Sequence, residues 1–415
     1  MSTLTLTHAH VLDPSQGLNQ LSDVVIEYGM ITAITPAGES NSTHPEFNAE
    51  DSLLLPGLID LSAHIDNVTS EILAAAKGGV THLCAQPSNK TLIDTPANVS
   101  LLQQASAKAN SSRLLPIGAL TQHLAGDQLA NMYSLKQAGC IALSNARAPI
   151  KNALVLRRIL EYATTHDMLV MLTAEDFSLS ANGKMHEGST ANRLGLTGIA
   201  EVAETTALAQ QLLLIELTGC RTHFSQLSCG RSVSMIRDAQ TQGLPVSADV
   251  AVANLMFTDE DVNGFDSTFY VKPPLRSEQD RLALLAGVND GTLAICSNHQ
   301  AQSIDAKKAP FAAAEAGMSI LDTWLSMMLT LVNKGELELD AMVYASSILP
   351  AKILNLNEGL QLKQLANLVI VKHNTETLYS TTSIASAGKN NPVLGETLMG
   401  QVLLTLSAGR EVYRA

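Results

Sequence analysis

The sequence predicts an α/β protein built around a (β/α)8 barrel, with a small β domain formed by the two ends of the chain. Two patterns indicate this fold: strand-like apolar runs alternate with longer helical stretches from residue 53 onward, and both ends of the chain are rich in short strands. The alternative is a doubly wound sheet, but no Gly-x-Gly-x-x-Gly motif follows a strand.

The N-terminal 54 residues are predicted to supply strands to the β domain. Short β-like runs are separated by Pro14, Gly17 and Gly29, and they lie at Leu4–Leu6, Asp23–Ile26 and Met30–Ile34. We therefore assign residues 1–54 to the first part of the β domain.

The middle of the chain, residues 55–350, is predicted to form the barrel. Its strand-like runs include Val80–Ala85, Gly139–Leu143, Met168–Leu172, Thr222–Leu227, Pro245–Val250 and Leu293–Cys296, with helical stretches at 97–109, 151–166 and 232–242 between them. Between Leu196 and Thr218 we expect a helix followed by a further strand-like run at Leu212–Ile215. The number of such units suits an eight-stranded barrel.

The C-terminal region, residues 351–415, returns to strands. The clearest are Leu365–Val371 and Gly400–Leu406, with turns at Gly395 and Gly409. Strand-rich ends around a βα middle predict that the two termini form one composite β domain.

Composition excludes several classes of function. The 415 residues are 46% hydrophobic and carry a net charge of −13, which would repel the phosphates of a nucleic acid. The five cysteines form no Cys-x-x-Cys pair, which is typical of a reducing cytoplasm. We expect neither a signal peptide nor a membrane span, because the N-terminus lacks a basic start and no long apolar run occurs.

Several stretches, taken together and in order, resemble the dihydroorotase branch of the amidohydrolase superfamily. They are Leu53–Asp60, Gly78–Thr81, Glu175–Ser180, Arg193–Leu196, Glu216–Gly219, Val271–Glu278 and Asn391–Gly395. The resemblance covers nearly the whole chain. It implies a TIM-type barrel with a composite β-sandwich, and in active relatives one or two zinc ions at the barrel mouth.

The positions that match the family's metal ligands and catalytic base are mostly altered. Five of the six carry uncharged residues that are not zinc-binding types, and only the histidine is kept: the positions are Ser62, His64, Asn145 (Ala146 if the alignment shifts by one), Thr173, Gln226 and Asn298. A catalytic zinc needs about three imidazole, thiolate or carboxylate ligands. We therefore expect no zinc or other cofactor. His64 and His299 are interpreted as satisfied histidines of the barrel mouth.

The positions that match the family's substrate contacts are altered as well. Asp66 stands where the family has a cation, Ser88 replaces an asparagine, and Lys272 replaces another asparagine. One further hypothesis is that Lys272 supplies a positive charge near the former metal position and faces Asp66.

The resemblance is strongest to the inactive dihydroorotase-like chains that accompany aspartate transcarbamoylase in some bacteria. It implies a cytoplasmic, non-catalytic scaffold in de novo pyrimidine biosynthesis, whose partner is the transcarbamoylase catalytic chain in a hetero-oligomer, with a homodimer as a further option. Two alternatives stay open: a divergent dihydroorotase or cyclic amidohydrolase with at most one metal, and a module that binds a pyrimidine intermediate.

Overall fold

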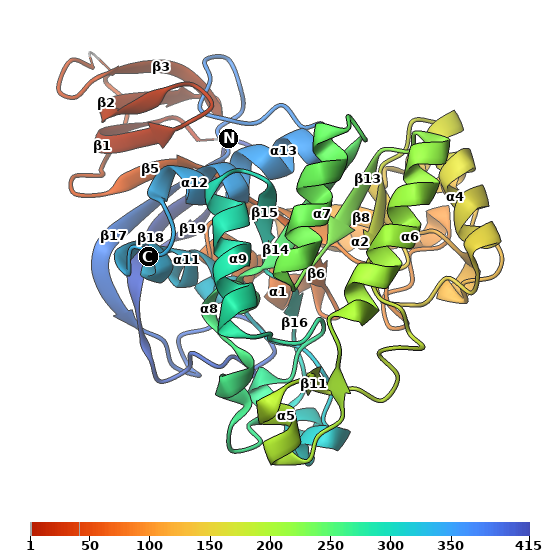
Figure 1. The fold of residues 1–415 in the computed structure, drawn as a ribbon. Helices are drawn as coiled ribbons and strands as arrows, with labels where there is room; N and C mark the ends of the chain where they lie inside the picture. The colour runs from red at the N-terminus through yellow and green to blue at the C-terminus, as the bar shows by residue number, and fades with distance from the viewer. Residues whose placement is uncertain (1, 41) are drawn as a thin grey trace.

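The computed structural model describes residues 2–40 and 42–415 and contains a parallel barrel and a separate β-sheet domain. Figure 1 shows the β domain beside the barrel, with its strands coloured from both ends of the chain. The predicted fold, a TIM-type barrel with a β domain made by both termini, is confirmed.

Eight consecutive parallel strands form the barrel wall. They are β6 (Leu58–His64), β7 (Val80–Ala85), β8 (Arg113–Ala119), β9 (Ala142–Ser144), β10 (Val170–Thr173), β13 (Thr222–Ser225), β14 (Val246–Ala251) and β15 (Leu293–Cys296). The short β16 (His299–Gln300) follows β15 and pairs with β6, so the two ends of the curled sheet meet. All eight strands therefore end at one mouth.

Helices surround the barrel and cover its outer face. They are α1 (Val68–Lys77), α2 (Pro96–Ala109), α3 (Met132–Ala138), α4 (Ala153–Thr165), α6 (Val202–Thr218), α7 (Gly230–Thr241), α8 (Val252–Met256), α9 (Glu278–Asn289), α11 (Trp324–Asn333), α12 (Leu339–Val343) and α13 (Leu349–Leu354), with a π-helical turn at Tyr344–Ile348 and 3-10 turns at Gln122–Leu124 and Leu321–Thr323. The side chain of Asn152 caps the N-terminus of α4 by accepting from the backbone N–H of Val155 at 3.0 Å.

The prediction of a strand at Leu212–Ile215 is wrong, because these residues belong to α6, which continues as far as Thr218. Four consecutive apolar residues fit a short buried strand and a helix equally well. The helix ends only at Gly219, whose φ of 64° is the left-handed conformation that closes helices.

A small cap lies over the mouth of the barrel. It contains the paired strands β11 (Met185–His186) and β12 (Gly198–Ile199), with α5 (Ser189–Leu194), α10 (Ile304–Lys308) and 3-10 turns at Asp259–Val262, Ser267–Phe269 and Phe311–Ala313. Met185, Val262, Tyr270 and Phe311 form a separate small apolar core inside it. The lower part of Figure 1 shows this cap projecting from the barrel.

The β domain interleaves strands from both termini. Its strands are β1 (Leu4–Asp13), β2 (Leu18–Glu27), β3 (Met30–Pro36), β4 (Glu46–Asn48), β5 (Leu53–Pro56), β17 (Leu368–Leu378), β18 (Thr397–Ser407) and β19 (Arg410–Arg414). In the sheet order β19-β18-β17-β5-β1-β2-β3, β5 pairs in parallel with β1 and antiparallel with β17. Leu54 of β5 is fully buried in the core that both groups of strands share.

Two glycines of the sequence motifs are required by close packing. A Cβ atom at Gly57 would lie 2.2 Å from the side chain of Thr81, and one at Gly78 would lie 2.0 Å from the carbonyl oxygen of Leu321. Both positions therefore admit no larger residue without movement of the neighbouring segment.

Among the residues that the structure describes, no helix combines the length and the hydropathy that crossing a membrane would require.

Candidate functional site at the barrel mouth

The six positions predicted from the family's metal and catalytic residues all lie where barrel strands end. Ser62 and His64 lie at the end of β6 and Thr173 ends β10, while Asn145, Gln226 and Asn298 directly follow or closely follow β9, β13 and β15. Side chains at the carboxyl ends of parallel strands point into one mouth, which is where barrel enzymes hold their active sites.

The structure brings Ser62 and Gln226 into direct contact. The amide Nε2 of Gln226 donates to Ser62 Oγ at 2.7 Å, and both side chains are buried. Two buried carboxylates fix the backbones of this pair: the Ser62 N–H donates to Asp60 at 3.2 Å, and the Gln226 N–H donates to Asp249 at 2.6 Å. Two neutral groups therefore bind each other where the family places two metal ligands.

The other neutral positions are satisfied separately. Asn145 Oδ1 accepts from the Thr121 N–H at 3.0 Å, and Thr173 Oγ1 donates to the carbonyl of Ala146 at 2.9 Å. Asn298 Nδ2 donates to the carbonyl of Lys272 at 3.1 Å. Each of these side chains therefore makes a hydrogen bond to the backbone of a neighbouring loop.

Arg147 is a residue of the mouth that the sequence analysis missed. Its Nη1 lies 2.9 Å from Glu175 Oε2, and Glu175 also accepts from Ser180 at 2.8 Å. Burial, together with the positive charge of Arg147, lowers the pKa of His64 to about 4, so His64 is neutral at pH 7. The signal in the sequence was an arginine two residues beyond Asn145, next to a barrel strand end.

The residues present at the mouth do not fit a metal ion. A zinc site needs about three ligands that are imidazole, thiolate or carboxylate. Across residues 2–40 and 42–415, no group of three or more histidine, cysteine or acidic residues is arranged to hold one. The Ser62–Gln226 hydrogen bond uses up one candidate pair, and the guanidinium of Arg147 would repel a cation near His64.

Of the three residues at positions that match the family's substrate contacts, two contact neighbouring loop residues and the third lines a small cavity. Asp66 pairs with Lys90 at 3.0 Å on the surface, and Ser88 accepts from the Thr91 N–H at 2.9 Å. Lys272 lines a small cavity together with Arg147 and Gln226. Among the described residues the ion pair of Asp66 is with Lys90, from the loop after β7, and none joins it to Lys272. That Lys272 supplies a positive charge near the former metal position stays a prediction.

His299 belongs to a polar cluster that ties the C-terminal segment to the barrel. Its Nε2 lies 2.9 Å from Glu71 Oε2, and its Nδ1 accepts from the Ile320 N–H at 3.0 Å. Burial raises the pKa of Glu71, but the hydrogen bond and charge of His299 outweigh it and lower that pKa to about 2. His299 thus contacts Glu71 and the backbone of Ile320, and it joins the barrel to the segment before α11.

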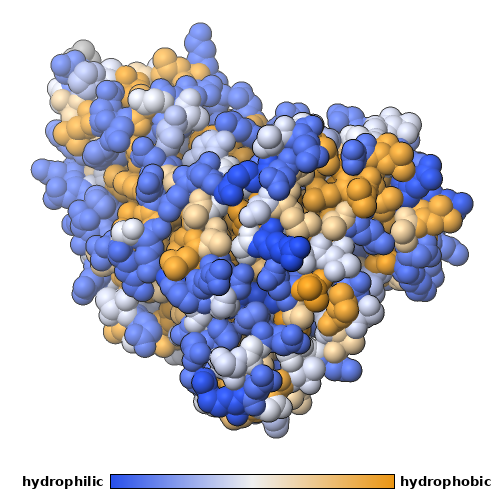
Figure 2. Space-filling model, in the orientation of Figure 1, coloured by the Kyte–Doolittle hydropathy of each residue, from blue (hydrophilic) through white to orange (hydrophobic). Residues whose placement is uncertain are grey.

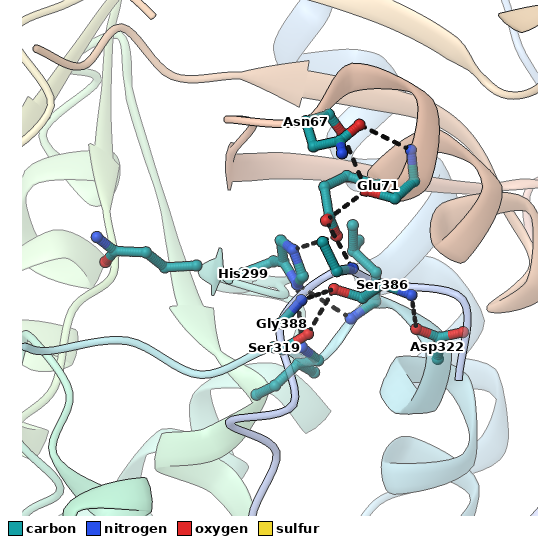
Figure 3. A network of polar contacts seen from close by, with 12 residues as sticks. Asn67, Glu71, His299, Ser319, Asp322, Ser386 and Gly388 are labelled. Atoms are coloured by element: carbon teal, nitrogen blue, oxygen red, sulfur yellow. Dashed lines mark hydrogen bonds and ion pairs between the residues drawn. The ribbon is translucent and has the colours of Figure 1, made fainter. Parts of the chain in front are cut away.

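The same cluster holds the loop that precedes β18. Glu71 accepts from the Ala387 N–H at 3.1 Å, and Asp322 accepts from the backbone of Ala385 at 2.6 Å and of Ser386 at 3.1 Å. Figure 3 shows these carboxylates and His299 around the backbone of the loop. A retained family histidine therefore serves packing between the barrel and the C-terminal segment.

The cysteines offer no nucleophile at this site. All five are free and buried. Burial, together with the charge of nearby Glu204, raises the pKa of the Cys229 thiol well above its usual range. Cys229 is therefore protonated and unreactive at neutral pH.

The chain is similar to dihydroorotases and their relatives. Residues 51–232 match the family model described as dihydro-orotase-like. The chain is 42% identical to a dihydroorotase-like protein of Pseudomonas aeruginosa, with 98% of each protein covered. It is 33% identical to a dihydroorotase of Trichlorobacter lovleyi, with 99% of each covered.

Solved structures agree on the fold. The L-hydantoinase (dihydropyrimidinase) of Arthrobacter aurescens superposes with a TM-score of 0.88 at 21% identity, covering 100% of this chain and 96% of that one. A dihydropyrimidinase from Brevibacillus agri gives a TM-score of 0.84 at 19% identity, covering 100% and 95%. At this level of identity the likeness concerns the barrel and the β domain alone.

The Ser62–Gln226 hydrogen bond predicts a measurable coupling between the two residues. Ser62→Ala should lower the free energy of unfolding by about 1–3 kcal/mol, because it leaves the Gln226 amide buried without an acceptor. In a double-mutant cycle with Gln226→Met, the double variant should lose clearly less than the sum of the two single losses. Urea unfolding measures all four proteins. Strictly additive losses would show that the contact contributes nothing.

Asp60, beneath this pair, predicts a pH dependence of stability. Burial raises its pKa to about 6, against which hydrogen bonds from Ser297 and Ser62 act. A folded pKa above the unfolded value of about 3.9 means that the contribution to stability is present below about pH 4 and lost as the pH rises through 6. Asp60→Asn should therefore gain on the wild type by roughly 2 kcal/mol between pH 4 and pH 7.5. Parallel stability curves for the two proteins would contradict this.

Proposed function

Because the chain belongs to the dihydroorotase-like family of amidohydrolases, we propose that it is a non-catalytic member, a subunit that acts in pyrimidine biosynthesis through its surface. The observation that carries the proposal is the hydrogen bond between Ser62 and Gln226. It occupies two of the positions where an active relative would need metal ligands, and it leaves no open coordination site.

Hydrolysis of a ring amide also needs a side chain that accepts and donates a proton, and the carboxylate that does this in active relatives is not present here. Asn298, at the position of the family's catalytic aspartate, is an amide that cannot accept a proton at neutral pH, and it donates to the Lys272 carbonyl. His64 could still take a proton, but its pKa of about 4 makes it a weak base.

A barrel without chemistry at its mouth can still hold other chains. We propose that this chain is a cytoplasmic scaffold for the catalytic chain of aspartate transcarbamoylase, as its resemblance to such subunits implies, and that it needs no metal or other cofactor. Support comes from the complete fold: the barrel, the cap and the two-ended β domain are intact although the pocket is altered.

A second candidate is a divergent cyclic amidohydrolase with at most one metal. It is favoured by relatives named dihydroorotase, such as the 35% identical protein of Syntrophus aciditrophicus, which the chain matches over 99% of each length. His64 would then be the single conserved ligand.

The scaffold proposal predicts a joint particle. The transcarbamoylase catalytic chain of the same organism should co-sediment with this protein as one larger species, with transcarbamoylase activity that is gained or stabilised relative to the catalytic chain alone. Analytical ultracentrifugation with activity assays on each fraction measures this. Two separate boundaries with unchanged activity would overturn the scaffold role.

Metal content separates the two candidates. Protein purified without chelator should carry far less than one zinc per chain by elemental analysis, and should neither close carbamoyl aspartate nor open dihydroorotate. About one zinc per chain, with turnover that a chelator abolishes and zinc restores, would favour the cyclic amidohydrolase.

A further inference from the structure

A hollow lies at the end of the barrel opposite the mouth. This basal hollow has a volume of about 370 Å³, and its walls include Ala142, Leu169 and Arg221, where β9, β10 and β13 begin, and Leu354, where α13 ends. Figure 1 shows α13 on the side of the barrel away from the cap. The basal hollow is therefore separate from the altered family site, which lies at the carboxyl ends of the same strands.

The walls of the basal hollow combine apolar side chains with a few charged ones. Leu169 is 2% exposed, Leu354 3% and Cys140 7%. They differ from the apolar side chains along α6, which are exposed on the outer surface of the molecule (Figure 2). Pockets for small molecules are typically apolar recesses of about 300–1,000 Å³ with a small number of polar groups. The basal hollow has this size and this composition.

Arg221 is the polar group that distinguishes this hollow. It is half-buried, and its Nε is buried with no hydrogen-bond partner among residues 2–40 and 42–415. The other arginines that are not fully exposed each pair with a carboxylate: Arg147 with Glu175, Arg276 with Glu204, and Arg281 with Glu278. In the described part of the chain no carboxylate pairs with Arg221 in this way. A guanidinium withdrawn from water without a counterion is costly, so the hollow favours an anion.

Two further charged side chains line the basal hollow, Lys136 and Asp167. The Nζ of Lys136 donates to the backbone carbonyls of His166 and Asp167, both at 2.8 Å, and stays positively charged. Together with Arg221 these groups carry two positive charges and one negative charge. The net positive charge suits a monoanion, because Asp167 would repel a dianion such as phosphate more strongly. A planar carboxylate also matches the planar guanidinium of an arginine.

We propose that the basal hollow binds a small organic molecule that has one carboxylate and an apolar body. Arg221 holds the carboxylate, and the side chains of Leu169 and Leu354 contact the apolar body. This site goes beyond the proposed function, because it depends neither on the altered mouth nor on a partner chain.

Matched pairs of acids and amides test the chemistry of the site. Benzoate, cyclohexanecarboxylate and 3-methylbutanoate are titrated into the full chain by calorimetry, each beside its neutral amide. At least one carboxylate should bind about tenfold or more tightly than its amide, because only the carboxylate is charged toward Arg221. Equal affinity of every acid and its amide, or binding of no carboxylate, would overturn the proposal.

Substitutions locate the bound carboxylate. Arg221→Gln should weaken its binding about tenfold or more, and Arg221→Lys, which keeps the charge, should give an intermediate affinity. Arg158→Gln is the matched control, because Arg158 is an exposed arginine of α4 outside the hollow. Lys272→Gln, at the mouth, should also bind as the wild type does. Binding that is lost in Lys272→Gln and kept in Arg221→Gln would assign the carboxylate to the mouth and overturn the basal site.

Two other anions separate the proposed ligand from related ones. Inorganic phosphate and a short peptide of glutamates should both bind the full chain more weakly than the best small carboxylate. Tighter binding of phosphate would contradict the monoanion. Tighter binding of the peptide, lost in Arg221→Gln, would assign the basal hollow to an acidic segment of a protein and overturn the small-molecule site.

Discussion

Balance of buried charge governs the mouth of this barrel. Eight parallel strands deliver their last side chains to one enclosed space, where an unmatched carboxylate would be costly. Three acids of the barrel interior have specific partners: Asp249 lies 2.9 Å from His223, Glu175 pairs with Arg147, and Glu204 accepts from the backbone and hydroxyl of Ser228. These pairings need no metal, and the shape of the mouth depends on them.

Two features stabilise the interior of the barrel: uncharged side chains that hydrogen-bond to each other, and an arginine that pairs with a carboxylate. Ser62 and Gln226 form a hydrogen bond with each other, so this pair of buried polar side chains is stabilised without a cation. Arg147 then supplies the positive charge that Glu175 requires. Exposed apolar side chains remain outside the barrel, among them Val202, Leu213 and Leu217 of α6.

The sequence was sufficient for the barrel and the two-ended β domain because alternation of strands and helices is a local pattern. It also placed Ser62, Thr173 and Gln226 correctly at strand ends, since the motifs mark those ends. It could not predict contacts between distant loops. Arg147 was missed because its partner Glu175 lies on another strand end, and the link between Asp66 and Lys90 depends on how two neighbouring loops fold. The run Leu212–Ile215 was misjudged because four apolar residues carry no period.

The position of β5 has a consequence for synthesis on the ribosome. This strand lies between β1, made first, and β17, made only after the whole barrel. One edge of β5 therefore stays unpaired until some 300 further residues have left the ribosome and β17 can pair with it. An unpaired edge strand invites pairing with other chains. During translation this protein should depend on chaperones that shield that edge, more than a barrel whose β domain is continuous.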